Sequence, residues 1–249
     1  MVVPVKNEAG NIAPLVGEIA QALAGVAYEI VYVDDGSTDA TPSILAELAS
    51  SYPLMVRRHV RSCGQSAAVV SGVQAARGPW IATLDGDGQN DPADIPALLA
   101  RAIAETAAGG GPVLIAGHRV TRRDTAVKRV TSRAANRLRA AILGDATPDT
   151  GCGLKVFGRA AFLQLPAFDH MHRYLPALFM RAGGRVVSVP VNHRPRGTGV
   201  SNYGTLDRAL VGIVDLFGVW WLLRRGSRPE FAPILNQTLP ALKTLNEDH

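Results

Sequence analysis

The chain has 249 residues, enough for one substantial α/β domain with appended elements but short for two full domains. Hydrophobic residues make up 47% and charged residues 19%, which excludes a disordered or fibrous protein. The net charge of +5 and the pI near 9.6 favour an anionic partner, namely a nucleotide, a nucleic acid or a membrane surface.

The two cysteines, Cys63 and Cys152, belong neither to a Cys-x-x-Cys pair nor to a Cys/His cluster with metal-ligand spacing. We therefore expect reduced thiols in a cytoplasmic protein. The opening MVVPVKNE lacks the basic and apolar regions of a signal peptide, so we expect no export. Because a strand already begins at Val2, we also expect a few residues to precede it in a longer version of the sequence.

Short apolar runs rich in β-branched residues alternate with helix-compatible segments in the first half of the chain. Buried parallel strands are predicted over residues 2–5, 29–33 and 80–84, and helices over 12–23, 41–50 and 66–76. Thr38 or Asp39 is the expected N-cap of the second helix, beside Pro42. This alternation predicts an α/β fold with a Rossmann-like, mostly parallel sheet flanked by helices. The functional loops of such a sheet follow the carboxyl ends of its strands.

The second half of the chain is more basic. Further strands are predicted over 113–116 and 185–191, and the second leads into the basic loop HRPRGTGVSNYG, residues 193–204. Another basic stretch covers 119–139. A C-terminal amphipathic helix is expected over 206–223, with an apolar stripe formed by Leu206, Leu210, Ile213, Phe217, Trp220 and Trp221.

The apolar run of this helix is interrupted by Asp215 and is shorter than the roughly 20 residues that cross a bilayer. The helix could lie on a membrane, where Arg224, Arg225 and Arg228 suit anionic lipids, or it could pack on the core. We therefore divide the chain into an α/β domain over 1–205, a helical extension over 206–228, and a tail over 229–249 whose role is not indicated.

The most specific local pattern is LDGDGQNDP, residues 84–92, which follows a predicted strand. Asp85 and Asp87, separated by a glycine, can both approach a hard cation that also bridges the phosphates of a nucleotide diphosphate. Gln89 adds a neutral oxygen ligand. The alternative is a polar turn in which Asp85 or Asp87 merely caps a helix.

Two more polar turns follow predicted strands. Asp35 in VDDGSTDAT can accept hydrogen bonds from a base or ribose, whereas Asp34 is expected to be structural. In PVKNEAGNI, Pro4 shapes the strand end and Glu8 can hold a base or ribose. The alternative is that Asn7 and Glu8 simply cap the following helix.

Basic residues supply candidate phosphate contacts. Arg119, at a strand end, can bind a diphosphate through its planar fork of donors. The glycine-rich basic loop brings Arg194, Arg196 and Ser201, and it suits closure over a pyrophosphate or an anionic acceptor. In FDHMHRYLP we expect Arg173 near the acceptor. His172 has no metal-ligand partner nearby in the sequence, so a packed or surface histidine is its default interpretation.

Taken together, PVKNEAGNI, VDDGSTDAT, LDGDGQNDP, GHR and HRPRGTGVSNYG resemble the family 2 inverting glycosyltransferases. The resemblance is to the branch of dolichyl-phosphate mannosyltransferase and bacterial polyprenyl-phosphate glycosyltransferases, and it covers about residues 2–225. It implies a GT-A fold, a nucleotide-sugar donor and a Mg²⁺ or Mn²⁺ ion at the D-x-D motif. Asn202 stands where related sequences often carry lysine, so we expect Arg194 and Arg196 to supply the charge of that loop.

The resemblance also implies roles for individual residues. Asp85, Asp87 and Gln89 look like the metal and diphosphate site, and Asp87 is the residue on which we expect activity to depend. The expected nucleoside contacts are Pro4, Asn7, Glu8 and Asp35. Candidate phosphate contacts are Arg119, Lys128, Ser132, Arg194 and Arg196.

The implied reaction moves a sugar, with inversion, from a GDP- or UDP-linked donor to a polyprenyl phosphate of the undecaprenyl or dolichyl type. A glycosyltransferase that uses a sugar or protein hydroxyl is the alternative, as is a non-catalytic nucleotide- or lipid-binding subunit. We expect no nucleic-acid partner, because no nucleic-acid module accompanies the positive charge. The expected location is the cytoplasm, with peripheral contact at the inner face of the cytoplasmic membrane.

Overall fold

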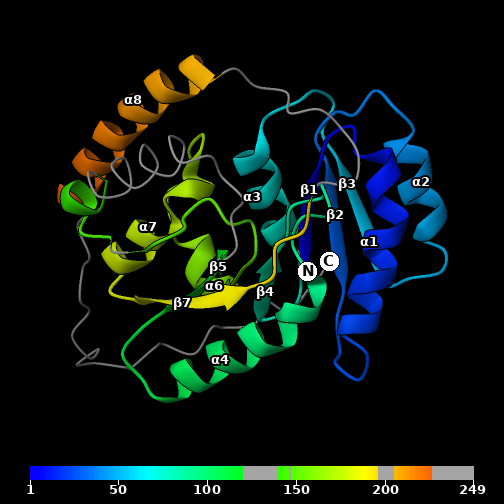
Figure 1. The fold of residues 1–249 in the computed structure, drawn as a ribbon, viewed down its shortest axis with the longest axis horizontal. Coiled ribbons are helices and arrows are strands. Elements are labelled where there is room, and N and C mark those ends of the chain that lie inside the picture. The colour runs from blue at the N-terminus through cyan, green and yellow to red at the C-terminus, as the bar shows by residue number, and fades with distance from the viewer. Residues whose placement is uncertain (120–138, 146, 196–204, 226–249) are drawn as a thin grey trace, which may run out of the picture.

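The computed structural model describes residues 1–119, 139–145, 147–195 and 205–225, and for residues 205–211 only the backbone. Seven strands form one sheet in the order β3-β2-β1-β4-β6-β5-β7 (Figure 1). The strands are β1 (Val2–Val5), β2 (Ile30–Asp34), β3 (Leu54–Arg58), β4 (Trp80–Thr83), β5 (Val113–Arg119), β6 (Lys155–Gly158) and β7 (Arg185–Val191).

Seven α-helices and two short 3₁₀ helices are defined in the described part of the chain. The helices are α1 (Ala9–Ala22), α2 (Thr41–Leu48), α3 (Gln65–Ala75), η1 (Pro92–Asp94), α4 (Ile95–Ala107), α6 (Arg159–Leu163), η2 (Met171–Arg173), α7 (Leu175–Arg181) and α8 (Thr205–Arg224). The expected N-cap of α2 is wrong: Ala40 holds that position, and Asp39 Oδ1 instead accepts a hydrogen bond from Thr41 N at 3.0 Å.

The alternation of side chains along the buried strands builds two apolar layers, one on each face of the sheet. Val3 and Tyr32 point to the layer covered by α1, α2 and α4, whereas Val2 and Val31 point to the layer covered by α3, α6 and α7. Consecutive residues of β1 and of β2 thus face opposite sides of the sheet. The predicted mostly parallel α/β sheet flanked by helices is confirmed.

Two strands were not predicted. β3 is an edge strand whose residues LMVRR are only half-buried or exposed, so it lacks a buried apolar run. β6 is short and runs antiparallel between β4 and β5, with Lys155 paired to Thr83 and to Ala116. This insertion breaks the simple strand–helix alternation and places the loop that precedes β6 beside the carboxyl ends of β4 and β5.

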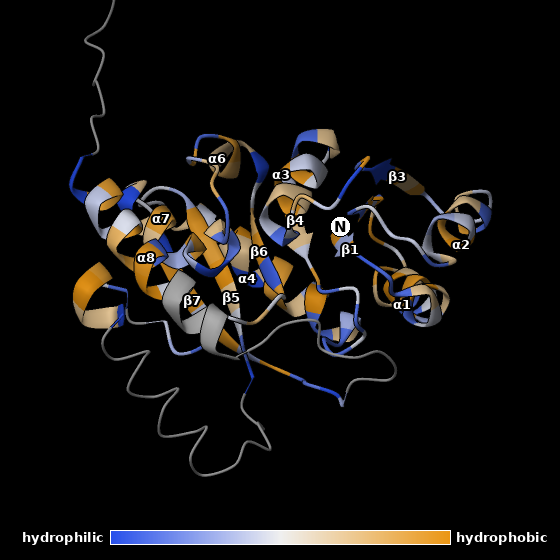
Figure 2. Cartoon of the chain, turned by 90° about the horizontal axis from the view of Figure 1, so that it is seen from above, coloured by the Kyte–Doolittle hydropathy of each residue, from blue (hydrophilic) through white to orange (hydrophobic). Residues whose placement is uncertain are grey.

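Helix α8 packs on α7 through Leu216, Val219 and Leu223, and hydrophobic residues occur along both helices (Figure 2). The described members of the predicted stripe lie on the other side of α8 and are exposed: Ile213, Phe217, Trp220 and Trp221. The core-packing explanation is therefore wrong for these four residues. An amphipathic pattern is not confirmed either, because α8 presents apolar residues on both sides.

Within the described residues, no helix has the length and apolar character needed to span a bilayer. The tail over 229–249, the basic stretch over 120–138 and most of the basic loop lie outside the described residues. Lys128, Ser132, Arg196 and Ser201 fall in these segments, so their predicted roles stay predictions.

Candidate active site

A cavity of about 370 Å³ opens at the carboxyl ends of β1, β4 and β5. This is the edge of the sheet where the polar turns were expected to gather. Its walls come from the ends of these strands, the start of α3, the loop before β6, and η2. The charged or polar residues that line it are Gln65, Thr83, Asp85, Arg119, Lys155, His172 and Arg173.

Asp85 projects from the end of β4 into this cavity, where Gln65 Nε2 donates a hydrogen bond to its Oδ1 at 2.7 Å. Burial and the neighbouring Asp87 raise the pKa of Asp85 to about 6, although Lys155 and Arg119 oppose the shift. Two carboxylates close enough to disfavour each other's charge would be stabilised by a cation between them. The residues present therefore fit a divalent cation.

Two glycines allow close packing at the D-x-D turn. A Cβ at Gly153 would overlap the Asp85 carboxylate, and a Cβ at Gly86 would overlap the side chain of Val5. The glycine between the two aspartates is thus required by close packing against β1. Gly153 comes from the loop before β6, far from Asp85 in sequence.

The D-x-D turn is joined to the segment after β7. Asp87 Oδ1 accepts a hydrogen bond from Gln89 N at 3.1 Å, and Gln89 O accepts one from Arg194 N at 2.8 Å. The guanidinium of Arg194 forms ion pairs with Asp91 at 2.6 Å and Glu18 at 2.9 Å. Arg194 does not line the cavity and holds the turn in place, so its expected phosphate contact stays a prediction.

Arg119, the last residue of β5, lines the cavity and is held by a residue that the sequence analysis missed, while its diphosphate contact stays a prediction. Its Nε and Nη2 donate to the two carboxylate oxygens of Asp149 at 2.7 and 2.8 Å. Both side chains are largely buried. The bidentate pair fixes the guanidinium beside Asp85. Asp149 lies in the loop before β6, and no local pattern pointed to it.

Lys155 is a second residue that the sequence analysis missed. It opens β6 and is almost fully buried, and its Nζ donates to the carbonyl oxygens of Thr150 and Cys152. Burial lowers the pKa of this ammonium, while the nearby Asp85 favours its charged form. A cation at this depth offsets part of the negative charge of the D-x-D motif.

His172 is a packed histidine, in agreement with its default interpretation, and it also lines the cavity. Ser66 Oγ accepts a hydrogen bond from His172 N at 3.2 Å and lies 2.7 Å from His172 Nδ1. Burial, aided by Lys155 and Arg173, lowers the pKa of His172 to about 3. The imidazole is therefore neutral near pH 7. The signal was present in the sequence, since His172 directly precedes Arg173.

The turns after β1 and β2 are bound tightly to each other. Asn7, at a φ of 56°, accepts a hydrogen bond from Thr38 N at 2.8 Å, and Asn7 N donates to Ser37 Oγ at 2.9 Å. Glu8 is the N-cap residue of α1, and Asn11 Nδ2 donates to its carboxylate at 2.6 Å. Asn7 thus joins the two turns, while the nucleoside roles of Asn7 and Glu8 stay predictions.

Pro4 lines the cavity, and Asp35 lies at the neighbouring strand end. Burial alone would raise the pKa of Asp35, but hydrogen bonds from Cys63 N, His59, Ser62 and Gly64 N hold it below its ordinary value. Asp35 as a whole is 5% exposed. Asp34 is fully buried, pairs with Arg58 and accepts from Ser37 N, which agrees with its expected structural role.

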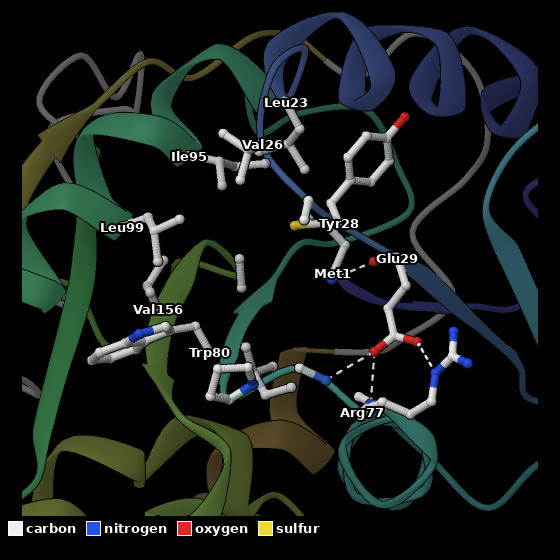
Figure 3. A pocket seen from close by; sticks show the side chains of 16 residues that line it. Met1, Leu23, Val26, Tyr28, Glu29, Arg77, Trp80, Ile95, Leu99 and Val156 are labelled. Carbon is white, nitrogen blue, oxygen red and sulfur yellow. Dashed lines mark hydrogen bonds and ion pairs between the residues drawn. The ribbon is translucent and has the colours of Figure 1, made fainter.

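A second cavity, of about 500 Å³, lies at the other end of the central strands (Figure 3). Its walls are mostly apolar and include Leu23, directly after α1, and Ile95 and Leu99 of α4. Glu29 is engaged by Arg77 and by the backbone of Gly78. The smaller cavity instead has a largely polar wall that includes Asp85, Arg119 and Lys155, and it is therefore the candidate active site.

Comparisons with known proteins identify the family of this chain. The family model described as glycosyl transferase family 2 matches residues 1–165. The chain belongs to this family and is a glycosyltransferase, as the motifs indicated.

The curated relatives include enzymes named for polyprenyl phosphates. Dodecaprenyl-phosphate galacturonate synthase of Rhizobium johnstonii is 35% identical over 236 residues, which cover 92% of this chain and 68% of the relative. Undecaprenyl-phosphate 4-deoxy-4-formamido-L-arabinose transferase of Enterobacter sp. strain 638 is 34% identical over 82% of this chain and 62% of the relative. The chain thus spans about two thirds of the length of these relatives.

Solved structures share the fold. Glucosyl-3-phosphoglycerate synthase from Mycobacterium tuberculosis, in complex with Mn²⁺ and UDP-glucose, matches with a TM-score of 0.63 and 23% identity over 87% of this chain and 78% of that one. Mannosyl-3-phosphoglycerate synthase from Rubrobacter xylanophilus matches with a TM-score of 0.67 and 19% identity over 93% and 77%. These likenesses confirm the predicted GT-A fold.

Proposed function

We propose that this glycosyltransferase inverts the configuration of a sugar as it moves it from a nucleotide diphosphate to a polyprenyl phosphate. The observation that carries the proposal is the combination of charges in the cavity. Asp85 and the cations Arg119, Lys155 and Arg173 line the same cavity. A carboxylate that can hold a metal, together with several cations, suits two phosphate-bearing substrates. The names of the curated relatives support this choice of acceptor.

Asp85, Asp87 and Gln89 would hold a Mg²⁺ or Mn²⁺ ion, which neutralises the diphosphate leaving group when it is bound. Gln65 and Gly153 keep the Asp85 carboxylate in place for that role. The Mn²⁺ in the complex of glucosyl-3-phosphoglycerate synthase supports a divalent ion here too.

The reaction needs no strong protein base. An acceptor phosphate is already ionised near neutral pH, so one of its oxygens can attack the anomeric carbon directly. The new carbon–oxygen bond forms opposite the bond to the nucleotide diphosphate, which breaks and leaves its electron pair on the diphosphate. The anomeric configuration is inverted.

Arg173 is the cation that we propose for the acceptor phosphate. Asp149 already holds Arg119, and two carbonyls hold Lys155. No ion pair engages Arg173 within the part of the chain that the structure describes. The neutral imidazole of His172, beside it, keeps an N–H available to a sugar or phosphate oxygen when Ser66 donates to Nδ1.

We also propose that α8, as the extension after the catalytic domain, rests on the inner face of the cytoplasmic membrane. Its outer side exposes Ile213, Val214, Phe217 and Trp221, with exposed fractions of 53 to 71%. Arg224 lies over the Trp220 ring at 4.1 Å from its centroid. Aromatic side chains beside arginines suit the headgroup region of an anionic bilayer.

The direct test is product formation from a panel of GDP- and UDP-sugars with Mg²⁺ or Mn²⁺, with and without a short polyprenyl phosphate. The proposal expects turnover that requires both the lipid phosphate and the metal. Asp87→Asn should abolish it, while Asp169→Asn, an exposed aspartate outside the cavity, should not. Donor hydrolysis without transfer would discard the lipid acceptor, and absence of nucleotide binding would overturn the proposal.

A further inference from the structure

Three metal-ligating side chains meet at the carboxyl ends of β2 and β3, outside the D-x-D turn. Asp35 directly follows β2, His59 directly follows β3, and Cys63 lies in the loop before α3. One ligand atom of each, a carboxylate oxygen, an imidazole nitrogen and the thiol sulfur, lies within 4.8 Å of the other two. The residues are 24 and 28 positions apart from Asp35, so the spacing of the sequence hid this cluster.

Ser71 orients the imidazole ring of His59. His59 Nδ1 lies 2.7 Å from Asp35 Oδ1, and its Nε2 lies 3.0 Å from Ser71 Oγ. In metal sites the ring nitrogen that does not bind the ion usually donates a hydrogen bond that fixes the ring. Ser71 can accept such a hydrogen bond, which leaves Nδ1 directed at the cluster.

A hydrogen-bond network is the competing explanation. Ser62 Oγ, Cys63 N and Gly64 N donate to the Asp35 carboxylate, so Asp35 and His59 are satisfied without an ion. In this network the exposed thiol of Cys63 donates a hydrogen bond to Arg61 O at 3.3 Å. An ion would instead take the thiolate as a ligand, so the state of this thiol distinguishes the two explanations.

We propose that Asp35, His59 and Cys63 form a binding site for a zinc-class divalent cation, separate from the D-x-D site. Thiolate and imidazole select borderline-soft ions such as Zn²⁺, whereas carboxylate and amide oxygens select Mg²⁺ or Mn²⁺. Three protein ligands leave a fourth position for water. Cys63 loses its proton to solvent on binding, and the remaining imidazole proton lies on Nε2 of His59.

The site needs only a small adjustment. Zinc–ligand bonds of about 2.0 to 2.3 Å place tetrahedral ligand atoms roughly 3.2 to 3.8 Å apart. The His59 and Asp35 atoms must therefore separate by about half an ångström from 2.7 Å, while the exposed thiol turns inward. The exposed Cys63 also gives the ion access from solvent.

The consequence for catalysis rests on the proposed function. Asp35 is an expected nucleoside contact, so an ion that engages its carboxylate would compete with the donor. We expect micromolar Zn²⁺ to raise the apparent KM for the nucleotide sugar severalfold while kcat changes little. Excess Mg²⁺ should not restore the KM, because it does not compete for a thiolate.

Cobalt provides a readout that does not depend on activity. Metal-free full-length protein is titrated with Co²⁺ in the presence of excess Mg²⁺, and the absorption spectrum is followed. We expect a thiolate-to-cobalt band in the near ultraviolet at one ion per chain, which Zn²⁺ abolishes by displacement. Cys63→Ser should remove the band, and His59→Gln should weaken Co²⁺ binding at least tenfold.

The controls separate this site from the rest of the protein. Cys152→Ser removes the other cysteine, which is buried, and Asp87→Asn removes a D-x-D ligand; both should keep the band. A band that persists in Cys63→Ser, or the absence of any band, overturns the proposal. UDP binding is measured on the same samples. Loss of UDP binding in all of them would count against the proposed function and leave the cation site standing.

Discussion

His170 Nδ1 lies 2.8 Å from Asp215 Oδ2, and this pair joins α8 to the segment that lines the active-site cavity. His170 adopts a left-handed conformation, with a φ of 62°, directly before η2. At the other end of η2, Tyr174 Oη donates to Gly212 O of α8 at 3.3 Å. Helix α8 therefore holds both ends of the short segment that carries His172 and Arg173.

Asp215→Asn should weaken acceptor use. The loss of the charged partner of His170 loosens η2, so we expect the KM for polyprenyl phosphate to rise severalfold. UDP affinity and metal-dependent donor hydrolysis should stay at the wild-type level. Steady-state kinetics with each substrate varied separately check this. Asp169→Asn is the matched control, and an equal effect on donor and acceptor would show that Asp215 has only a general structural role.

Asp87→Asn should lower turnover on the order of 100-fold or more, because the D-x-D site loses a charged ligand. The fold should be retained, since Asp87 is only half-buried at a turn. Initial rates and isothermal titration with Mn²⁺ measure the two effects. A variant with normal activity would contradict the assignment of Asp87.

Gly153→Ala should impair the same site from a distance in sequence. The added Cβ would overlap the Asp85 carboxylate and displace it. We expect weaker Mn²⁺ binding and a loss of activity on the order of tenfold. Gly158→Ala is the matched control, because its Cβ meets no atom within 4 Å and its φ of −69° is allowed for alanine. Equal activity of the two variants would be inconsistent with close packing at Gly153.

His172 should make the protein less stable in acid. Its pKa of about 3 in the folded state lies below the ordinary value near 6.5, so the unfolded chain binds the extra proton first. The stability that the neutral imidazole contributes is present above pH 6.5 and is lost as pH falls toward 3. The titration of His172 changes the free energy of unfolding by at most about 1.4 kcal/mol per pH unit.

Urea unfolding of wild type and His172→Gln between pH 4 and 7 tests this contribution. The difference in the free energy of unfolding between the two proteins should shrink as the pH falls. His118→Gln is the control, because it alters a histidine elsewhere on the sheet. A difference that does not change with pH would show that His172 is not buried as a neutral group.

Replacing Phe217 and Trp221 by serine should reduce binding to anionic vesicles at least severalfold. Both side chains are exposed, so the midpoint of unfolding should change little. Cosedimentation with vesicles that contain phosphatidylglycerol measures the effect. Val60→Ser removes an even more exposed apolar residue at the opposite end of the sheet order, and it should bind as wild type does. Unchanged vesicle binding of the double variant would remove α8 from the proposed membrane contact.

Local sequence patterns were sufficient for much of the fold. β1, β2 and β4 are apolar runs bounded by polar turns, and the alternation with helices predicted the parallel part of the sheet. β3 was missed because it is a half-exposed edge strand without a buried apolar run. β6 was missed because it is an antiparallel insertion between two strands, which breaks the expected strand–helix alternation.

For the active site, the sequence by itself determined that Asp85, Asp87 and Arg119 follow strand ends and therefore share one edge of the sheet. Only the tertiary structure decided what surrounds them. The antiparallel insertion of β6 brings Asp149 and Lys155 to Arg119 and Asp85, and it depends on strand pairing between distant segments. Local residue patterns report periodicity and turn chemistry, whereas strand order and contacts between distant loops are settled by packing across the whole chain.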